Sequence, residues 1–174
     1  MRISSEPTED PKGLPALSRY ENHPEECRKL SQNITDGKKF ILGFGQNKDG
    51  ELGLSHYREG QKEPRPLNLA DDMNAAQSIS SGSHHSALVT KSGELYVCGS
   101  SLHGKLGLPE LSSSTNINKF ARIPLKSTIR QVACGDYHTL ALSKEGWVYT
   151  WGGSLHKKAS GGSEPTIVQT LVEK

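Results

Sequence analysis

The chain has 174 residues, enough for one domain of ordinary size, and 33% of them are hydrophobic while 18 are glycine. Its net charge of +2 comes from 21 Lys and Arg residues against 19 Asp and Glu residues, which are scattered without a block of like sign. This pattern argues against a nucleic-acid-binding protein, and the Gly-rich, aromatic-poor composition is typical of a β-protein with short strands.

The N-terminal residues and the cysteines indicate an intracellular protein. Residues 1–13 lack the apolar core of a signal peptide, and no apolar run approaches the roughly 18 residues of a membrane span. Cys27, Cys98 and Cys134 are odd in number and have no framework spacing, which favours free thiols in a reducing compartment. We therefore expect the protein in the cytoplasm, with the nucleus as the alternative, and away from membranes.

Residues 1–33 differ in composition from the rest of the chain. Pro7, Pro11 and Pro15 recur among Ser, Glu and Asp residues, which cannot bury enough apolar surface to offset the entropy of an ordered chain. This composition predicts a flexible, mostly disordered N-terminal tail. A short helix is predicted over residues 24–31, because Pro24 suits the first turn of a helix.

From Phe40 onward, the chain repeats itself with a period of 53 or 54 residues. Residues 81–99 align without a gap to residues 134–152, and six of the 19 positions are identical. Residues 44–54 align in the same way to residues 98–108, with five of 11 positions identical. Self-similarity at such a period is the signature of a solenoid, a propeller or another array of repeats.

Each repeat unit contains the same series of predicted elements. A strand that ends in an aromatic residue and Gly leads into a Gly-rich turn closing with Leu-Gly-Leu, then a variable polar loop, then a two-stranded hairpin. Gly93 and Gly146 stand at the hairpin tips, where a tight turn needs a residue with positive φ. The predicted strands of this kind are residues 40–42, 87–89, 95–97, 140–142 and 148–150.

Three further strands contain proline, residues 65–67, 122–124 and 164–168. Because Pro donates no ladder hydrogen bond, these strands are expected at sheet edges. In the third copy, residues 153–162 replace the Leu-Gly-Leu turn, so this turn should differ in shape from the other two.

The repeat unit resembles that of the regulator of chromosome condensation family over roughly residues 34–174. The resemblance rests on motifs that recur in order and in phase: the aromatic-Gly strand end, Gly-x-Leu-Gly-Leu, and Gly-x-x-His followed by Ser or Thr. It implies an all-β fold, a β-propeller of four-stranded blades. This chain, with about ten predicted strands, would form a partial β-propeller of about two and a half blades. The expected units are residues 40–93, 94–146 and an incomplete 147–174.

A partial propeller would leave blade faces and strand edges uncovered, which invites pairing with other strands. We therefore expect the chain to be a piece of a longer protein. The alternatives are an arc that closes by self-association and a partial gene product.

The residues that could carry chemistry fit structural roles. His85 and His138 occupy the same repeat position, and the rotation of successive blades would keep their rings apart. Cys98 stands where the other copies have an aromatic residue, so it is expected to pack as a small hydrophobic residue. Trp147 and Trp151 are expected to pack between blades. Without a nucleophile elbow, a phosphate-binding loop or metal-ligand spacing, we predict no catalytic, cofactor-binding or metal-binding residues.

Two functions from different classes stay open. The first is a non-enzymatic protein-interaction scaffold, because a rigid framework that presents variable loops is suited to binding. Its partner would be another protein, a small GTPase among the candidates, or the remainder of a longer polypeptide. The second function, implied by the resemblance, is guanine-nucleotide exchange on a Ran-like small GTPase, the activity of the founding family member. Exchange would need blades beyond those in this chain.

The candidate partner-binding residues lie in the variable loops 47–50, 55–63, 101–105 and 109–118. They are Asn47, Lys48, Asp49, His56, Tyr57, Arg58, Leu102, His103, Lys105, Glu110 and Asn116.

Overall fold

The computed structural model describes residues 41–56, 58–67, 76–111, 114–153 and 162–168. Every described residue belongs to one compact unit, which spans residues 40–174. The predicted tail with its helix, and most of the altered turn of the third copy, lie outside the described residues.

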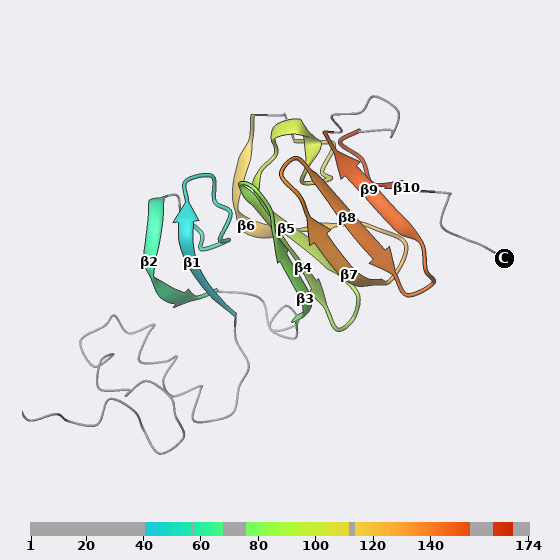
Figure 1. Cartoon of the computed structure of the whole chain (residues 1–174), viewed down its shortest axis with the longest axis horizontal. Helices are drawn as coiled ribbons and strands as arrows, with labels where there is room; N and C mark the ends of the chain where they lie inside the picture. The colour runs from blue at the N-terminus through green and yellow to red at the C-terminus, as the bar shows by residue number, and fades with distance from the viewer. Residues whose placement is uncertain (1–40, 57, 68–75, 112–113, 154–161, 169–174) are drawn as a thin grey trace, which may run out of the picture. The chain divides into compact units, whose positions relative to one another are not determined.

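The described residues form ten strands, the number that the sequence indicates, and one short 3-10 helix (Figure 1). Their bounds are β1 (Leu42–Asn47), β2 (Arg58–Pro66), β3 (Ala76–Ser81), β4 (His85–Thr90), β5 (Leu95–Ser100), η2 (Leu102–Gly104), β6 (Asn116–Ile123), β7 (Ile129–Cys134), β8 (His138–Ser143), β9 (Val148–Gly152) and β10 (Thr166–Ile167). In the part of the chain that the structure describes, no helix has the length and hydropathy to cross a membrane.

The strands form three antiparallel sheets. The first sheet pairs β1 with β2, the middle sheet has the order β3-β4-β5-β6, and the last sheet has the order β7-β8-β9-β10. The predicted Pro-containing strands correspond to β2, β6 and β10, and each lies at the edge of its sheet, as expected. Gly93 and Gly146 have φ angles of +89° and +93° at the tips of the β4–β5 and β8–β9 hairpins, which confirms the predicted tight turns.

The boundaries of the sequence repeats do not coincide with the boundaries of the sheets. The unit 40–93 supplies β1 and β2 to the first sheet and β3 and β4 to the middle sheet. The unit 94–146 in the same way supplies β5 and β6 to the middle sheet and β7 and β8 to the last sheet. Each repeat unit therefore joins two neighbouring sheets through the covalent chain.

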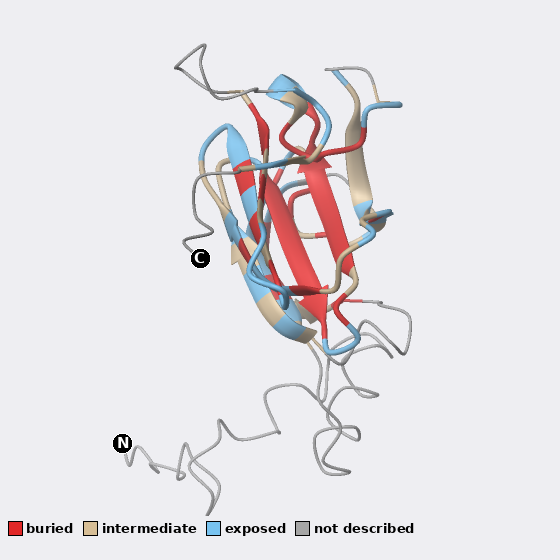
Figure 2. Ribbon diagram, turned by 90° about the vertical axis from the view of Figure 1, so that its right-hand side faces the viewer, coloured by how far each residue is buried: buried red, intermediate tan, exposed pale blue. Residues whose placement is uncertain are grey.

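The main core lies between the middle and last sheets. Strands β4 and β5 are buried along their whole length, as Figure 2 shows in red. A smaller cluster of Leu67, Leu88 and Tyr96 joins the first sheet to the middle sheet. The buried side chains of the main core are Ala87, Val89, Leu95, Val97 and Ile123 from the middle sheet, Leu106 and Leu108 from the turn after β5, and Ile129, Val132, Ala141, Tyr149 and Trp151 from the last sheet.

One backbone oxygen fixes the last sheet against the turn that follows β5. The carbonyl oxygen of Lys105 accepts a hydrogen bond from Thr139 Oγ1 at 2.8 Å and another from Trp151 Nε1 at 3.0 Å. Lys105 directly precedes the Leu-Gly-Leu of its turn. We name this oxygen the turn carbonyl. Because both donors belong to the last sheet, they hold β8 and β9 against the turn.

The same contact recurs one repeat earlier with different side chains. The turn carbonyl of Glu51 accepts hydrogen bonds from Ser86 Oγ at 2.6 Å and from Cys98 Sγ at 3.4 Å. Cys98 is fully buried, as expected, and this burial raises the pKa of its thiol. The backbone of the turn therefore defines the contact, whereas the donating side chains differ between copies.

The two tryptophans of the last sheet have different surroundings. Trp151 is buried between the middle and last sheets, as predicted. Trp147 is 39% exposed, so the prediction that it packs between blades is wrong for the described structure. Trp147 lies in the β8–β9 turn, beyond the last ladder pair of Leu142 with Val148, and therefore outside the contact between the sheets.

We predict that Gly107→Ala destabilises the protein more than Gly146→Ala does. A Cβ at Gly107 would lie 2.7 Å from Nε1 of Trp151, a buried side chain that cannot move away, whereas a Cβ at Gly146 would meet nothing within 4 Å. Both positions have positive φ, so both variants carry about 1–2 kcal/mol of backbone strain. Only Gly107→Ala adds overpacking, of about 1–3 kcal/mol. Urea unfolding measures the difference, and equal losses in the two variants would contradict this account of the turn.

Candidate functional site

The variable loops emerge at one end of the strands. Because successive strands are antiparallel, the β1–β2, β3–β4, β5–β6 and β7–β8 connections share that end, which we name the loop face. The β4–β5 and β8–β9 hairpins turn at the opposite end, which we name the tip face. Of the described residues, the loop face consists of 48–56, 82–84, 101–111, 114–115 and 135–137, and the tip face of 91–94 and 144–147.

The β1–β2 loop is attached to the middle sheet by the side chain of Asp49. One oxygen of this carboxylate lies 2.7 Å from His84 Nδ1, and the other accepts a hydrogen bond from Asn116 Nδ2 at 2.8 Å. Of the predicted site residues, Asp49 and Asn116 are thus brought together. His84, in the β3–β4 turn, remains exposed on the loop face.

A second pair occupies the same positions one repeat later. His103 follows Asp49 by 54 residues, and Tyr137 follows His84 by 53. The rings of His103 and Tyr137 meet edge to face, with centroids 5.0 Å apart and an interplanar angle of 79°. We name Asp49–His84 and His103–Tyr137 the rim pairs. They hold equivalent places in the scaffold and present different chemistry, a carboxylate with an imidazole in one and two aromatic rings in the other.

Two predicted site residues are buried, which corrects the expectation that their side chains face a partner. Asn47 is buried because its amide holds the loop together: Nδ2 donates to the carbonyl of His56 at 2.8 Å, and Oδ1 accepts from the Leu52 N–H at 3.0 Å. Lys105 is buried because its ammonium turns inward and donates to the carbonyl of Ser83 at 3.0 Å.

The remaining predicted residues have varied places. Tyr57 lies outside the described residues, as does the side chain of Arg58. His56 is half-buried, with Nδ1 2.9 Å from the carbonyl oxygen of Leu54. Four of the predicted site residues are exposed on the loop face: Lys48, Leu102, His103 and Glu110.

Lys105 lies among three carboxylates below the loop face. Burial lowers the pKa of its ammonium, and the negative charges of Asp49, Asp136 and Glu51 oppose that shift. Asp49, Glu51 and His84 each place one potential ligand atom within 4.8 Å of the others, an arrangement that a cation could use. Protein groups already engage these atoms, since Asp49 contacts His84 and Glu51 Oε2 accepts the Asp49 N–H at 2.8 Å. We therefore assign no metal to them.

His85, the repeated histidine, belongs to the contact between the middle and last sheets. It is fully buried, and its Nε2 lies 2.8 Å from Thr139 Oγ1. Because that hydroxyl donates its proton to the Lys105 turn carbonyl, it accepts from His85, so Nε2 carries the imidazole proton. The ring lies against Gly82, where a Cβ would come 2.7 Å from His85 Cε1, and this explains the recurring Gly-x-x-His. Burial, and then the Lys105 ammonium, lower the pKa of His85 to about 4.

The second repeated histidine has other surroundings. His138, which lies 53 residues after His85, is exposed on the opposite side of the last sheet from Thr139. The two imidazoles therefore belong to different surfaces and form no joint site.

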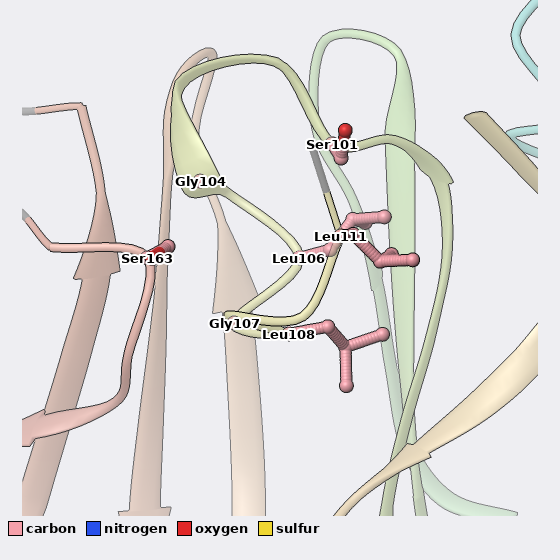
Figure 3. Close-up of a pocket in the computed structure, with 7 residues that line it drawn as sticks. All are labelled: Ser101, Gly104, Leu106, Gly107, Leu108, Leu111 and Ser163. Carbon is pink, nitrogen blue, oxygen red and sulfur yellow. The ribbon is translucent and has the colours of Figure 1, made fainter. Parts of the chain in front are cut away.

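A cavity of about 170 Å³ lies between the turn after β5 and the segment before β10 (Figure 3). Three leucines supply its apolar wall, Leu106, Leu108 and Leu111, and the remaining lining residues are Ser101, Gly104, Gly107 and Ser163. Sites for small molecules usually measure about 300–1,000 Å³. This cavity is too small for a ligand of that kind, so the loop face is the better candidate for a functional site.

Family models decide which family this architecture represents. The model described as "Regulator of chromosome condensation (RCC1) repeat" matches residues 40–89 and 92–142, and a second model with the same description matches residues 76–105 and 129–156. Together they cover more than half of the chain. The chain belongs to the RCC1 repeat family.

Similar proteins of known name are much longer than this chain. It is 36% identical over 114 residues to the secretion-regulating guanine nucleotide exchange factor of Mus musculus, covering 64% of the chain and 24% of that protein. It is 29% identical over 130 residues to the probable E3 ubiquitin-protein ligase HERC6 of Homo sapiens, covering 72% of the chain and 12% of that protein. The chain thus spans a quarter or less of these two relatives.

The solved structures confirm the propeller fold. The crystal structure of Kap60 bound to yeast RCC1 (Prp20) contains a chain that matches with a TM-score of 0.68 at 23% identity, over 76% of this chain and 33% of that one. Each four-stranded sheet is therefore an RCC1 blade, and the first sheet is the half-blade of the predicted partial propeller.

Two residues of the rim pairs, His84 and Tyr137, are not among the partner-binding residues predicted from the sequence. Their signal is visible in the alignment of the two copies, because the residue before the repeated histidine is His in one copy and Tyr in the other. When the residue type differs between copies at one position and is identical at the next, the variable position is expected to lie on a surface that the fold does not constrain.

We predict that His85 makes stability fall with acidity between pH 6.5 and about 4. In this window the unfolded chain binds a proton at His85 and the folded chain does not. The contribution of neutral His85 to the free energy of unfolding is therefore fully present above the window and is lost as the pH falls through it. A shift of this size corresponds to about 3 kcal/mol. Urea unfolding of His85→Gln across this range should show a shallower pH dependence than the unmodified chain, by at most about 1.4 kcal/mol per pH unit.

The matched control for this prediction is His138→Gln, at the same repeat position. Its imidazole is exposed in the folded protein and is only a minor cause of the lowered pKa of His85, so the substitution should change the pH dependence much less than His85→Gln does. The same slope in His85→Gln and His138→Gln would contradict the role given to burial.

Proposed function

We propose that this chain is a non-catalytic protein-interaction module that binds a partner protein through its loop face. The observation that carries the proposal is the rim pairs: two equivalent places on one scaffold present a carboxylate–imidazole pair and an aromatic pair. Side chains that vary on a fixed framework provide specificity without changing the fold.

Exposed apolar and aromatic side chains strengthen the second rim pair as a binding site. Leu102 and Tyr137 are 47% and 43% exposed, and His103, which follows Leu102 in the chain, contacts the Tyr137 ring. Aromatic side chains at the centre of an interface commonly contribute much of its binding energy. This cluster of three residues, which we name the Tyr137 cluster, is the expected anchor for a partner.

The backbone holds the Tyr137 cluster in place before any partner arrives. The N–H of Gly104 donates to the Ser101 carbonyl at 2.9 Å, and the N–H of Gly153 donates to the Tyr137 carbonyl at 2.9 Å. Turns that are ordered in advance lose less entropy on binding, which favours affinity.

Guanine-nucleotide exchange on a small GTPase is the second candidate function. It is favoured by the similarity of the chain, at 36% identity, to the secretion-regulating guanine nucleotide exchange factor of the mouse. The loop face would then be the surface that meets the GTPase, with further blades supplied by a longer polypeptide. Free thiols at Cys98 and Cys134 support a place of action in the cytoplasm, or alternatively the nucleus, for either function.

We predict that Tyr137→Ala removes partner binding while Trp147→Ala preserves it. The two aromatic side chains are similarly exposed, at 43% and 39%, but Tyr137 lies on the loop face and Trp147 on the tip face. The full chain and both variants are immobilised, and the proteins that each retains from a lysate of its source cells are quantified by mass spectrometry. A defined set should be retained by the unmodified chain and Trp147→Ala, and reduced at least about tenfold by Tyr137→Ala. Equal retention by the two variants would count against the loop face.

The exchange hypothesis predicts that the chain accelerates the release of nucleotide from a small GTPase. Purified Ran loaded with a fluorescent GDP is mixed with a micromolar concentration of the chain, and the rate of nucleotide release is followed. Exchange activity requires faster release, with the acceleration lost in Tyr137→Ala and kept in Trp147→Ala. A release rate equal to that of Ran alone would reject exchange by this chain and leave the interaction module as the proposal.

A further inference from the structure

The Gly-rich turns after β1 and β5 have the same backbone structure. We name residues 47–54 the first turn and residues 101–108, which follow them by 54 positions, the second turn. In each turn the N–H of the glycine between the two leucines donates to the carbonyl of the preceding glycine, at 2.9 Å in the first turn and at 3.0 Å in the second. Differences between the two turns can therefore be assigned to their side chains.

The first turn is filled from within by an amide that the second turn lacks. Asn47 is fully buried, where its Nδ2 donates to the carbonyl of His56 and its Oδ1 accepts from the N–H of Leu52. Ser101 is the equivalent of Asn47 in the second turn, and it is also buried. Its side chain is shorter than that of Asn47 and has no amide, so it fills less of the turn.

The same replacement occurs on the segment that covers each turn. A Cβ at Gly50 would lie 2.8 Å from Cα of Asn118, and a Cβ at Gly104 would lie 2.8 Å from Cα of Ser163. Asn118 and Ser163 thus cover equivalent glycines from the same place. The second turn again has a serine where the first turn has an asparagine.

These two smaller side chains leave space at the second turn. The cavity of about 170 Å³ has Ser101 and Ser163 in its lining, together with the apolar wall of Leu106, Leu108 and Leu111 (Figure 3). It lies between parts of the middle and last sheets, which both have four strands. The cavity therefore does not depend on where the chain begins or ends.

The size and the place of this cavity suit one side chain of a bound protein. An apolar cavity of about 150 Å³ can hold a molecule of the size of benzene, so this cavity can hold a side chain such as Leu, Met or Phe. It adjoins the Tyr137 cluster, because Leu102 and His103 lie between two of its lining residues, Ser101 and Gly104.

The exposed charges beside the cavity are negative. Among the described residues, Glu110 directly precedes the lining residue Leu111, and Glu164 directly follows the lining residue Ser163; both glutamates are exposed. Lys105 also lies next to lining residues, but its ammonium turns inward to the carbonyl of Ser83. A bound segment with basic residues would complement these two carboxylates.

We propose that this cavity receives one apolar side chain of a partner protein, from a segment in which Lys or Arg flanks that residue. The Tyr137 cluster then contacts the partner beside the inserted side chain. This inference rests on the proposed function, since it names the chemistry that the loop face recognises.

The first experiment determines which peptides the cavity selects. Random peptides displayed on phage are selected against the immobilised full chain, and the affinity of an enriched peptide is measured by fluorescence polarisation. The enriched peptides should share a Leu, Met or Phe flanked by Lys or Arg. Enrichment of peptides without an apolar residue or with acidic flanks would overturn the proposal, as would a selection that enriches nothing because the chain itself fills the cavity.

The test variant is Ser101→Asn, which gives the second turn the side chain of the first. The new amide should fill the cavity and bond the Leu106 N–H and the Glu110 carbonyl, the equivalents of the groups that Asn47 holds. Peptide binding should weaken at least about tenfold, while urea unfolding shows a stability equal to or above that of the unmodified chain. Ser163→Asn, which fills the cavity from the opposite wall, should weaken binding in the same way.

The matched control is Ser55→Asn, at an exposed serine of the loop face outside the cavity. Ser55 has a φ of +64°, which asparagine tolerates, so this variant should bind the peptide as the unmodified chain does. Equal binding by Ser101→Asn and Ser55→Asn would overturn the proposal.

Retention of proteins from the lysate separates this inference from the proposed function. If Tyr137→Ala removes the retained proteins and Ser101→Asn does not, the cavity proposal fails and the interaction module stands. If neither variant changes retention, the proposed function fails as well.

Discussion

Two successive blades in the described part of this protein are each positioned by one backbone oxygen of the preceding turn, which accepts two hydrogen bonds from the blade that follows. The oxygens of Glu51 and Lys105 occupy this place in successive repeats. A buried carbonyl left unpaired costs about 1–3 kcal/mol, so the turn and the following blade must fit together. Because the turn supplies the acceptor from its backbone, the donors can be Ser and Cys in one repeat and Thr and Trp in the next. The Gly-rich turn, the burial of β8 and β9 and the place of the rim pairs all depend on this contact.

Fixing the blades through the backbone leaves the loop face free to differ. The Asp49–His84 pair and the His103–Tyr137 pair lie at equivalent positions, yet one is polar and the other aromatic. Neither pair is needed to close the contact that holds the blades together. The residues that build the scaffold are thus different from those that a partner could contact. For this reason the family resemblance determines the fold and does not identify the partner.

The sequence predicts the backbone well because its strongest signals are local. Glycines at hairpin tips and prolines at sheet edges carry their own backbone constraints, and the structure confirms both. The repeat pattern correctly predicts that Trp151 is buried. It wrongly predicts that Trp147 packs between blades, because the pattern does not show where the β8–β9 hairpin extends beyond the neighbouring sheet. Asn47 and Lys105 are polar residues in polar loops, so their burial follows only from the path of the chain. The path of the chain brings the Ser83 carbonyl within hydrogen-bonding distance of the Lys105 ammonium.

The candidate site is less predictable than the fold, since its residues meet across repeats. Asp49 and His84 are 35 residues apart in the chain, and His103 and Tyr137 are 34 apart. Composition and spacing identify the loops of Asp49 and His103 but not the turns in which His84 and Tyr137 lie. They do not identify the contacts, which arise only when the turn of one repeat lies beside the hairpin of the next.

The offset between repeat unit and sheet has a consequence for how such a chain can change in length. Since each complete unit contributes two strands to each of two neighbouring blades, a duplication of about 53 residues adds one complete blade wherever in the unit the break occurs. The new blade inherits a turn carbonyl on one side and its donors on the other. Genetic recombination within these repeats therefore preserves the joint between blades without having to occur at a blade boundary.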